Sequence, residues 1–371
     1  MRIRDDPIPK MSQRFAIVIG VLYGVICQLA IRAEVMQDLY GVMSLGYIFV
    51  LPLILGTVTL WYATPGQQES WLYRLFAPWG TAALCLLVSI LVGWEGAICL
   101  IMAAVIYLPL ASLGGIVTGI LLSHRERTKI HSSVFASVLA LPLVCAFVEQ
   151  QFSLPVSYRG AATAIDIDAP VSLVWQNIIR VPPIHEPLDG FFYRMGFPKP
   201  VEATLSYEGV GGVRHATFER GLVFIETVDQ WIPEELLSFG IRVAPDSVPP
   251  TTLDEHVVVG GRYFDVLRGT YRIERLSDQR VRLHLTSDFR LATRFNFYSG
   301  VWATFLMRDI QQTILQVIKS RCERQASTSA SLDRENGENT TLLNTFVQLP
   351  APNSQFLSWS SPQTTAAQSV R

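Results

Sequence analysis

Charge is scarce in the first third of the chain. Charged residues are frequent from Arg159 to Glu323, but residues 15–123 carry only six: Arg32, Glu34, Asp38, Glu69, Arg74 and Glu95. Over the whole chain, 50% of residues are hydrophobic and 16% are charged, which lies on the apolar side of average composition. The early part of the sequence is therefore suited to lipid and the later part to water.

Metal-binding, redox and nucleotide-binding patterns are also lacking. The six histidines and five cysteines contain neither a helical histidine pair around a glutamate nor a CxxC motif. Most of the cysteines lie in apolar runs and Cys322 has no companion in its domain, so we expect no structural disulfide, no metal and no cofactor. The net charge is −1 with acids and bases interspersed, which argues against a nucleic-acid partner. No nucleophile elbow or phosphate-binding glycine loop is present.

Long apolar stretches are what the first part does contain. A helix needs about 20 apolar residues to cross the hydrocarbon core of a bilayer. Five stretches meet this requirement and predict about five transmembrane helices, at residues 15–31, 41–62, 78–94, 96–122 and 133–148. The third stretch is short, so a re-entrant segment is an alternative there.

Basic residues predict the orientation of these helices. Short loops rich in Arg and Lys stay in the cytoplasm. With the N-terminus inside, the outer loops hold a single basic residue, Arg32, and the domain after the fifth helix lies outside the cytoplasm. One helix more or fewer would move that domain to the cytoplasmic side. We expect an integral membrane protein, with a bacterial inner membrane as its location and membrane lipids as partners.

Two glycine pairs in the apolar stretches have the spacing that lets helix backbones approach closely, Gly20 with Gly24 and Gly115 with Gly119. They predict either close packing within the chain or a homo-oligomer interface.

After residue 150 the sequence changes to short alternating segments bounded by Gly, Pro and Asp, which are typical of strands. A strand at 162–168 and a helix at 171–180 precede expected strands at about 201–208, 212–220, 222–231, 235–243, 254–260, 266–276 and 280–290. A long amphipathic helix, about 298–324, closes the domain with Trp302, Leu306 and Ile310 on its apolar face. We expect the curved sheet to wrap this face and to leave a cavity between sheet and helix.

The predicted organisation has four parts. Residues 1–14 form a cytoplasmic N-terminus, 15–150 an α-helical membrane region, and 156–325 an α+β domain with a curved antiparallel sheet around its C-terminal helix. Residues 326–371 are rich in Ser, Thr, Asn and Gln, and this composition predicts a disordered tail.

Three motifs in the α+β domain resemble a known superfamily. Residues 165–175, IDIDAPVSLVW, resemble the first strand and helix start of the START-related SRPBCC superfamily, which includes polyketide cyclase/dehydrase-like and lipid-transfer domains. Residues 221–231, GLVFIETVDQW, are similar to its central strand, and residues 302–323 to its C-terminal helix. The resemblance implies a helix-grip fold that holds a hydrophobic ligand such as a lipid, sterol, isoprenoid or polyketide.

Glu226 and His215 are the candidate catalytic residues. Glu226 alternates with Phe224 and Val228, so its carboxyl can face the apolar interior, where burial would raise its pKa and suit it to acid or base work. Alternatively, Glu226 lies at an edge or mouth and pairs with Arg214. His215 can also point inward, in either a structural or a catalytic role.

The residues expected to line the ligand cavity come from strands and helices alike: Trp175, Phe192, His215, Phe224, Glu226, Tyr271, Leu283, Trp302, Leu306 and Ile310. The sequence therefore predicts a membrane-anchored protein that binds or transfers a hydrophobic small molecule. The alternatives are a cyclase- or dehydratase-like enzyme acting on a hydrophobic substrate, and a structural or sensory membrane subunit.

Overall fold

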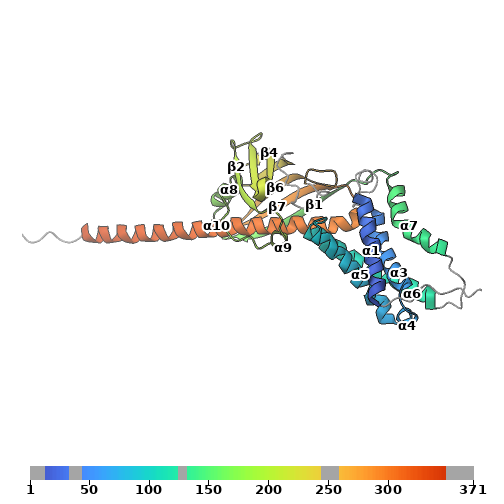
Figure 1. Cartoon of the computed structure of the whole chain (residues 1–371). Helices are drawn as coiled ribbons and strands as arrows, with labels where there is room; N and C mark the ends of the chain where they lie inside the picture. The colour runs from blue at the N-terminus through green and yellow to red at the C-terminus, as the bar shows by residue number, and fades with distance from the viewer. Residues whose placement is uncertain (1–12, 33–43, 124–131, 244–258, 348–371) are drawn as a thin grey trace, which may run out of the picture. The chain divides into compact units, whose positions relative to one another are not determined.

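The computed structural model describes residues 13–32, 44–123, 132–243 and 259–347. The chain divides into two compact units, Met1–Glu323 and Arg324–Arg371. The apolar helices and the whole β-sheet belong to the first unit (Figure 1).

The N-terminal region is helical. Each expected apolar stretch coincides with a helix or a helix pair: α1 (Gln13–Arg32), η1 (Gly46–Val50) with α3 (Leu51–Trp61), α5 (Trp71–Leu91), α6 (Ala97–Ser123) and α7 (Ser132–Glu149), with the short α4 (Pro65–Glu69) before α5. Two of these helices are long and apolar enough to cross a bilayer, over Trp71–Leu91 and Ile98–Ser123. The other three apolar helices are shorter, over Phe15–Ala30, Gly46–Trp61 and Val134–Glu149.

The third apolar helix is longer than expected. It begins at Trp71 rather than at Pro78, because the Ser70 side chain caps it by accepting a hydrogen bond from the Tyr73 backbone N–H. Pro78 lies inside the helix. The re-entrant alternative rested on a short third helix and loses that basis.

The glycine pairs pack against α5 of the same chain. A Cβ atom built on Gly20, Gly24, Gly115 or Gly119 would lie 2.6 Å from an α5 side chain in each case. Such a distance is too short for a real Cβ, so these positions need glycine for the close approach of α1 and α6 to α5. The contacts favour packing within the chain, and the homo-oligomer interface stays a prediction.

The second part of the first unit is an antiparallel sheet of seven strands among the residues described. The strands are β1 (Ser157–Ile167), β2 (Pro200–Leu205), β3 (Val213–Phe218), β4 (Val223–Ile232), β5 (Leu236–Val243), β6 (Phe264–Ser277) and β7 (Arg280–Leu291), in the spatial order β1-β7-β6-β5-β4-β3-β2. Two helices, α8 (Val171–Ile179) and α9 (Phe191–Arg194), connect β1 to β2, and a 3₁₀ turn, η2 (Glu219–Gly221), precedes β4. The expected strand at 254–260 lies almost wholly outside the described residues.

The first part of helix α10 (Asn296–Val347), up to Glu323, covers the inner face of the sheet. The face that meets the sheet carries Ala303 and Met307, whereas Trp302, Leu306 and Ile310 pack against α9 and the start of α6. The expectation that the second set faces the sheet is therefore wrong. The small Ala303 side chain lets the helix approach the strands, and the larger side chains fill the wider space on the other side.

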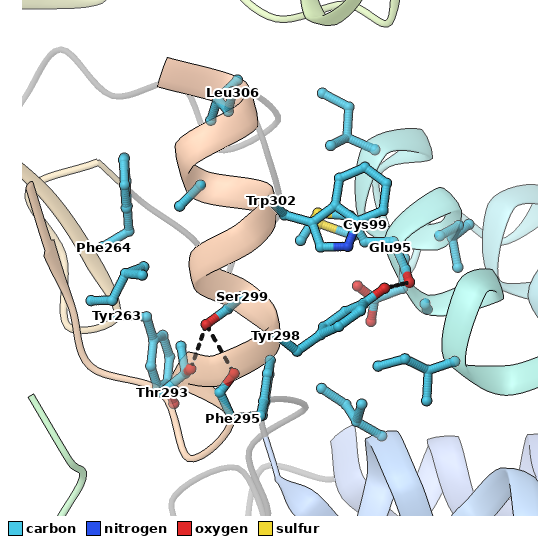
Figure 2. A pocket seen from close by; sticks show the side chains of 18 of the residues that line it. Glu95, Cys99, Tyr263, Phe264, Thr293, Phe295, Tyr298, Ser299, Trp302 and Leu306 are labelled. Atoms are coloured by element: carbon cyan, nitrogen blue, oxygen red, sulfur yellow. Dashed lines mark hydrogen bonds between the residues drawn. The ribbon is translucent and has the colours of Figure 1, made fainter. Parts of the chain in front are cut away.

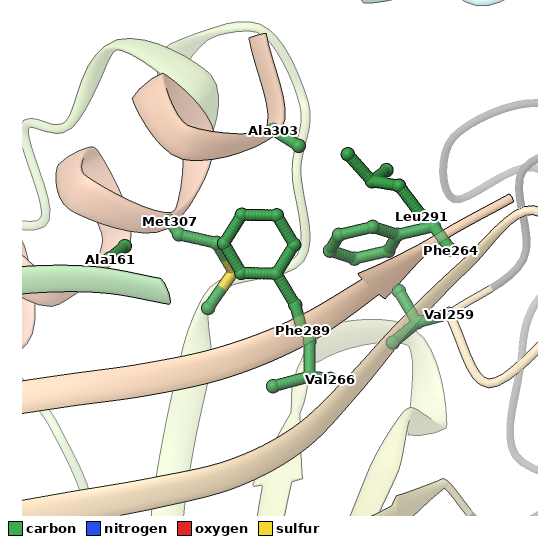
Figure 3. Close-up of a cluster of buried hydrophobic side chains, with 8 residues drawn as sticks. All are labelled: Ala161, Val259, Phe264, Val266, Phe289, Leu291, Ala303 and Met307. Atoms are coloured by element: carbon green, nitrogen blue, oxygen red, sulfur yellow. The ribbon is translucent and has the colours of Figure 1, made fainter. Parts of the chain in front are cut away.

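Figure 3 shows the cluster that joins the sheet to α10. Phe289 of β7 is fully buried, and its ring lies 5.9 Å from that of Phe264 on β6. Met307 and Ala303 cover these rings from the helix. The sheet and α10 depend on each other through this cluster, because removing either would expose the apolar surface of the other.

α10 continues well past residue 324, its expected end. The expectation of disorder is corrected for residues 326–347, while residues 348–371 lie outside the described residues. No proline occurs between Arg324 and Leu349. Extending a formed helix avoids the cost of nucleating a new one, so even a polar segment without proline can continue it.

Candidate functional site

An apolar cavity of about 150 Å³ lies where the first turns of α10 meet the apolar helices (Figure 2). The part of the chain that carries the sheet contributes Phe192, Tyr263, Phe264, Leu291, Thr293, Phe295, Tyr298, Ser299, Trp302, Ala303 and Leu306. The apolar helices and the turn before α6 contribute Tyr47, Ile48, Leu86, Glu95, Ile98, Cys99, Leu100, Met102, Ala103, Ile106 and Tyr107.

Hydrogen bonds fix the first turns of α10 beside α6. The Asn296 side chain accepts from the Thr293 backbone N–H at 2.8 Å, and the Thr293 and Ser299 hydroxyls lie 2.8 Å apart. The Tyr298 hydroxyl donates to the Met102 carbonyl of α6. In Figure 2, Tyr298 and Trp302 point from α10 toward the apolar helices, and Phe264 lies on the other side of the helix. The cavity lining therefore wraps around the beginning of α10.

The volume of the cavity limits what it can hold. Pockets for drug-sized ligands usually measure about 300 to 1,000 Å³. An apolar cavity of roughly 150 Å³ accommodates a group of the size of benzene. The cavity can thus enclose one ring or the end of an acyl chain, and the rest of a larger ligand would lie outside it.

Three of the residues expected to bind ligand line this cavity: Phe192, Trp302 and Leu306. Ile310 packs beside them in the adjoining cluster but is not part of the lining. The sequence reasoning missed the contribution of α6 and η1. Their residues belong to uniformly apolar helices, so no pattern in the sequence distinguishes a cavity-lining side chain from its neighbours.

The other expected ligand-binding residues lie elsewhere. Tyr271 and Leu283 are buried on the inner face of the sheet, and half-buried Phe224 packs beside the cluster in Figure 3. Trp175 of α8 packs edge-on against Trp231 of β4, with ring centroids 5.1 Å apart. These four residues are core residues of the sheet domain and do not touch the cavity.

His215 points away from the interior. Its side chain is exposed, whereas its neighbours Arg214 and Ala216 are buried. The expectation of an inward His215 is wrong, because alternate residues of a strand face opposite sides and the buried set here is the one that contains an arginine. Arginine is rarely buried without a partner, so the sequence pattern alone favours the opposite choice, in which Arg214 is exposed and His215 is buried.

A partner explains the buried Arg214. Its Nη1 atom lies 3.0 Å from Glu226 Oε2, and the two side chains are only 3% and 9% exposed. The guanidinium also lies over the Phe239 ring, 4.8 Å from its centroid. Glu226 thus pairs with Arg214, as in the alternative interpretation, but inside the domain rather than at an edge.

The environment of this pair alters two titrating groups. Burial raises the pKa of the Glu226 carboxyl above its usual range, and the nearby Arg214 offsets part of the rise. Burial likewise raises the pKa of Tyr271 to about 12. The contact between Arg214 and Glu226 is ionic, because within the described part of the chain no hydrogen-bond partner is found for Arg214 Nε, Arg214 Nη1 or Glu226 Oε2. The buried Tyr193 hydroxyl also has no hydrogen-bond partner there. The cluster can stabilise the sheet, or it can exchange a proton with a bound substrate.

Comparison with known proteins gives similarity in solved structures only. No family model matches the sequence, and no curated protein matches it. The Zhui aromatase/cyclase from Streptomyces sp. R1128 is 17% identical, with a TM-score of 0.29, and the match covers 46% of this chain and 96% of that chain. A START superfamily protein from Mycobacterium smegmatis is 12% identical, with a TM-score of 0.29 and coverage of 45% and 98%. The XoxI protein from Bacillus cereus is 16% identical, with a TM-score of 0.29 and coverage of 44% and 94%. Each of these matches covers less than half of this chain but nearly the whole of the solved structure.

Proposed function

We propose that the chain is an integral membrane protein that binds the apolar part of a lipid, sterol, isoprenoid or polyketide-like ligand. The observation that carries this proposal is the cavity in Figure 2, because its walls come from both α10 and the apolar helices. A ligand dissolved in a bilayer would reach such a cavity along the helices without passing through water. The proposed role is capture or transfer of this ligand at the membrane surface.

The surface of the apolar helices supports the membrane location. Leu72 and Leu91 of α5 are 67% and 75% exposed, and Ile26 of α1 is 62% exposed. In the most apolar 18-residue stretch of α5, and likewise of α6, only 33% is buried inside the protein. The core helices of a soluble protein bury such side chains, whereas helices in a bilayer present them to lipid.

The proposed orientation places the N-terminus in the cytoplasm and the sheet domain outside it. Its support is the scarcity of basic residues in the predicted outer loops. The test is a reporter that works only in the cytoplasm, fused after Arg324. Activity of this fusion would exclude the proposed orientation.

Filling the cavity tests the binding proposal. Leu306→Trp adds volume inside the lining, while Gln312→Trp introduces the same side chain at an exposed position of the same helix. The purified full-length protein would be analysed by native mass spectrometry, with extraction and identification of bound lipids. We expect wild type and Gln312→Trp to carry an apolar ligand and Leu306→Trp to lose it without a large loss of stability. Equal ligand content in the two variants would show that the cavity is not the binding site.

The Arg214–Glu226 pair supports a second candidate, a cyclase- or dehydratase-like enzyme. A buried carboxyl with a raised pKa, close to the Tyr271 hydroxyl, is a suitable acid or base for a hydrophobic substrate. Under this proposal Glu226→Gln lowers the turnover of a polyketide-like substrate by about 10²- to 10⁴-fold. If Glu226→Gln binds ligand normally and no substrate is converted by wild type, binding alone remains. A protein without any bound lipid would favour the structural or sensory subunit.

A further inference from the structure

The first turns of α10 expose large apolar side chains on one side. Phe297, Val301 and Phe305 follow one another at intervals of four residues, and they are 68%, 64% and 45% exposed. This spacing places them on the same side of a helix. Isolated exposed apolar residues are common, but a continuous stripe with two phenylalanines indicates an interaction surface.

The same side of α10 becomes polar farther along. Arg308 follows Phe305 by three residues and Gln312 follows Arg308 by four, which keeps both on this side of the helix, and both are exposed. From Val301 to Gln312 the helix rises about 16 Å, at 1.5 Å per residue. The exposed side of α10 therefore changes from apolar to polar over a short distance. Apolar residues scattered singly over a protein surface would not be separated in this way.

The apolar stripe is continuous with the apolar helices. The Phe297 ring lies 5.9 Å from that of Phe49 in η1, and the Tyr298 hydroxyl bonds to the Met102 carbonyl of α6. On α6, next to Met102, Ile101 and Val105 are also exposed. Whatever surrounds the outer side of α6 therefore also reaches the beginning of α10.

We propose that Phe297, Val301 and Phe305 lie in the boundary between headgroups and acyl chains of the bilayer, so that α10 begins as an interfacial helix. This inference rests on the proposed membrane location and adds which face of the sheet domain contacts lipid. Aromatic residues are enriched at this depth, and amphipathic helices bury an apolar face about 5–10 Å into it. Arg308 marks the point where the helix leaves the apolar layer, since a long basic side chain can reach the headgroups.

Spin labels on the full-length protein in phospholipid nanodiscs test the proposal. Nitroxides would be attached at Val301→Cys, Gln312→Cys and Leu87→Cys, one at a time, in a chain that carries Cys99→Ala and Cys145→Ala and whose other three cysteines are buried. Leu87 is an exposed residue of α5 and reports whether the apolar helices are in lipid. Collision with oxygen measures lipid exposure, and collision with a water-soluble nickel chelate measures water exposure.

We expect the oxygen-to-nickel collision ratio to be several-fold higher at positions 301 and 87 than at 312. A label at 301 that resembles the one at 312, while 87 is in lipid, would overturn the interfacial face and leave the membrane location standing. Shielding of 301 from both reagents would also overturn it, because protein, for example a second copy of the chain, would then cover the stripe. Water exposure at 87 would remove the membrane location itself.

Discussion

The apolar helices and the sheet domain distribute polar side chains in opposite ways. The helices expose residues such as Leu72 and Leu91 and bury Gln28, whose amide lies 2.9 Å from both the Tyr47 and the Ser89 hydroxyls. The sheet domain buries side chains such as Leu237, Leu283 and Phe289, and apart from the stripe on α10 it exposes mostly charged and polar residues. Both regions follow the same rule, that apolar surface meets an apolar environment, and each buries polar side chains that have partners, such as Gln28 in the helices and Arg214 in the sheet. What differs is the surroundings, as the proposed membrane location requires.

The largest expected effect concerns whether the sheet domain folds independently of the apolar helices. Residues 156–325 should fold and unfold cooperatively without the apolar helices, since the sheet and the beginning of α10 share their own core. Deleting 298–324 should abolish this transition completely, because it uncovers Phe289 and the rest of the inner face. Thermal unfolding followed by circular dichroism measures both fragments. A cooperative transition in the shortened fragment would show that α10 is not required for the fold.

The buried ion pair gives the next effect. Arg214→Met leaves Glu226 without its partner and should lower the free energy of unfolding by about 3–5 kcal/mol. Combining it with Glu226→Leu should restore most of that loss, because the uncompensated carboxyl is then removed. The exposed pair Arg180–Glu208 is the matched control, and Arg180→Met should cost less than about 1 kcal/mol. Equal losses in denaturant titrations of the two arginine variants would contradict the importance of burial.

A polar contact among the apolar helices should matter less. Gln28→Leu removes hydrogen bonds to Tyr47 and Ser89, and such bonds between helices in membranes contribute about 0.6 kcal/mol on average and up to about 1.7. Thermal unfolding in detergent should show a small decrease in the midpoint. Leu22→Ala changes the exposed side of the same helix and should have little effect. The comparison fails if Leu22→Ala is the more damaging substitution.

The smallest effect concerns an exposed ion pair and its dependence on pH. Hydrogen bonding to Arg282, together with Arg280, lowers the pKa of Asp166. The charged form is thus favoured in the folded protein, and its contribution to stability is present above the ordinary pKa and disappears as the pH falls through the lowered one. Wild type and Asp166→Asn should therefore differ slightly at neutral pH and converge in acid. A difference that grows in acid would show the opposite sign of coupling.

Elements with a clear period were predictable from the sequence, and choices between two faces were not. Alternation and turn residues located the described strands, although β1 begins at Ser157 rather than at the expected residue 162, and the resemblance implied their arrangement around α10. Which side of α10 meets the sheet depended on the fit of Ala303, a property of the assembled structure rather than of its helical period. The predicted orientation of His215 was wrong for a related reason. Its strand buries Arg214 instead, and this burial is favourable only because Glu226 approaches from the neighbouring strand. The contribution of the apolar helices to the cavity could not be foreseen, because the cavity forms between parts of the chain that are far apart in the sequence.

The pairing of β1 with β7 has a consequence for biosynthesis. Ser157 pairs with Leu291, and Arg159 donates to the Asn296 carbonyl, 137 positions farther along the chain. Contacts at such separation form slowly, because a long loop must close before they add stability. During translation, the first strand therefore has to remain unpaired until the last strand and α10 have left the ribosome. By then the apolar helices, from α1 to α7, have long been synthesised, so under the proposed membrane location the sheet domain completes its folding after these helices can enter the bilayer.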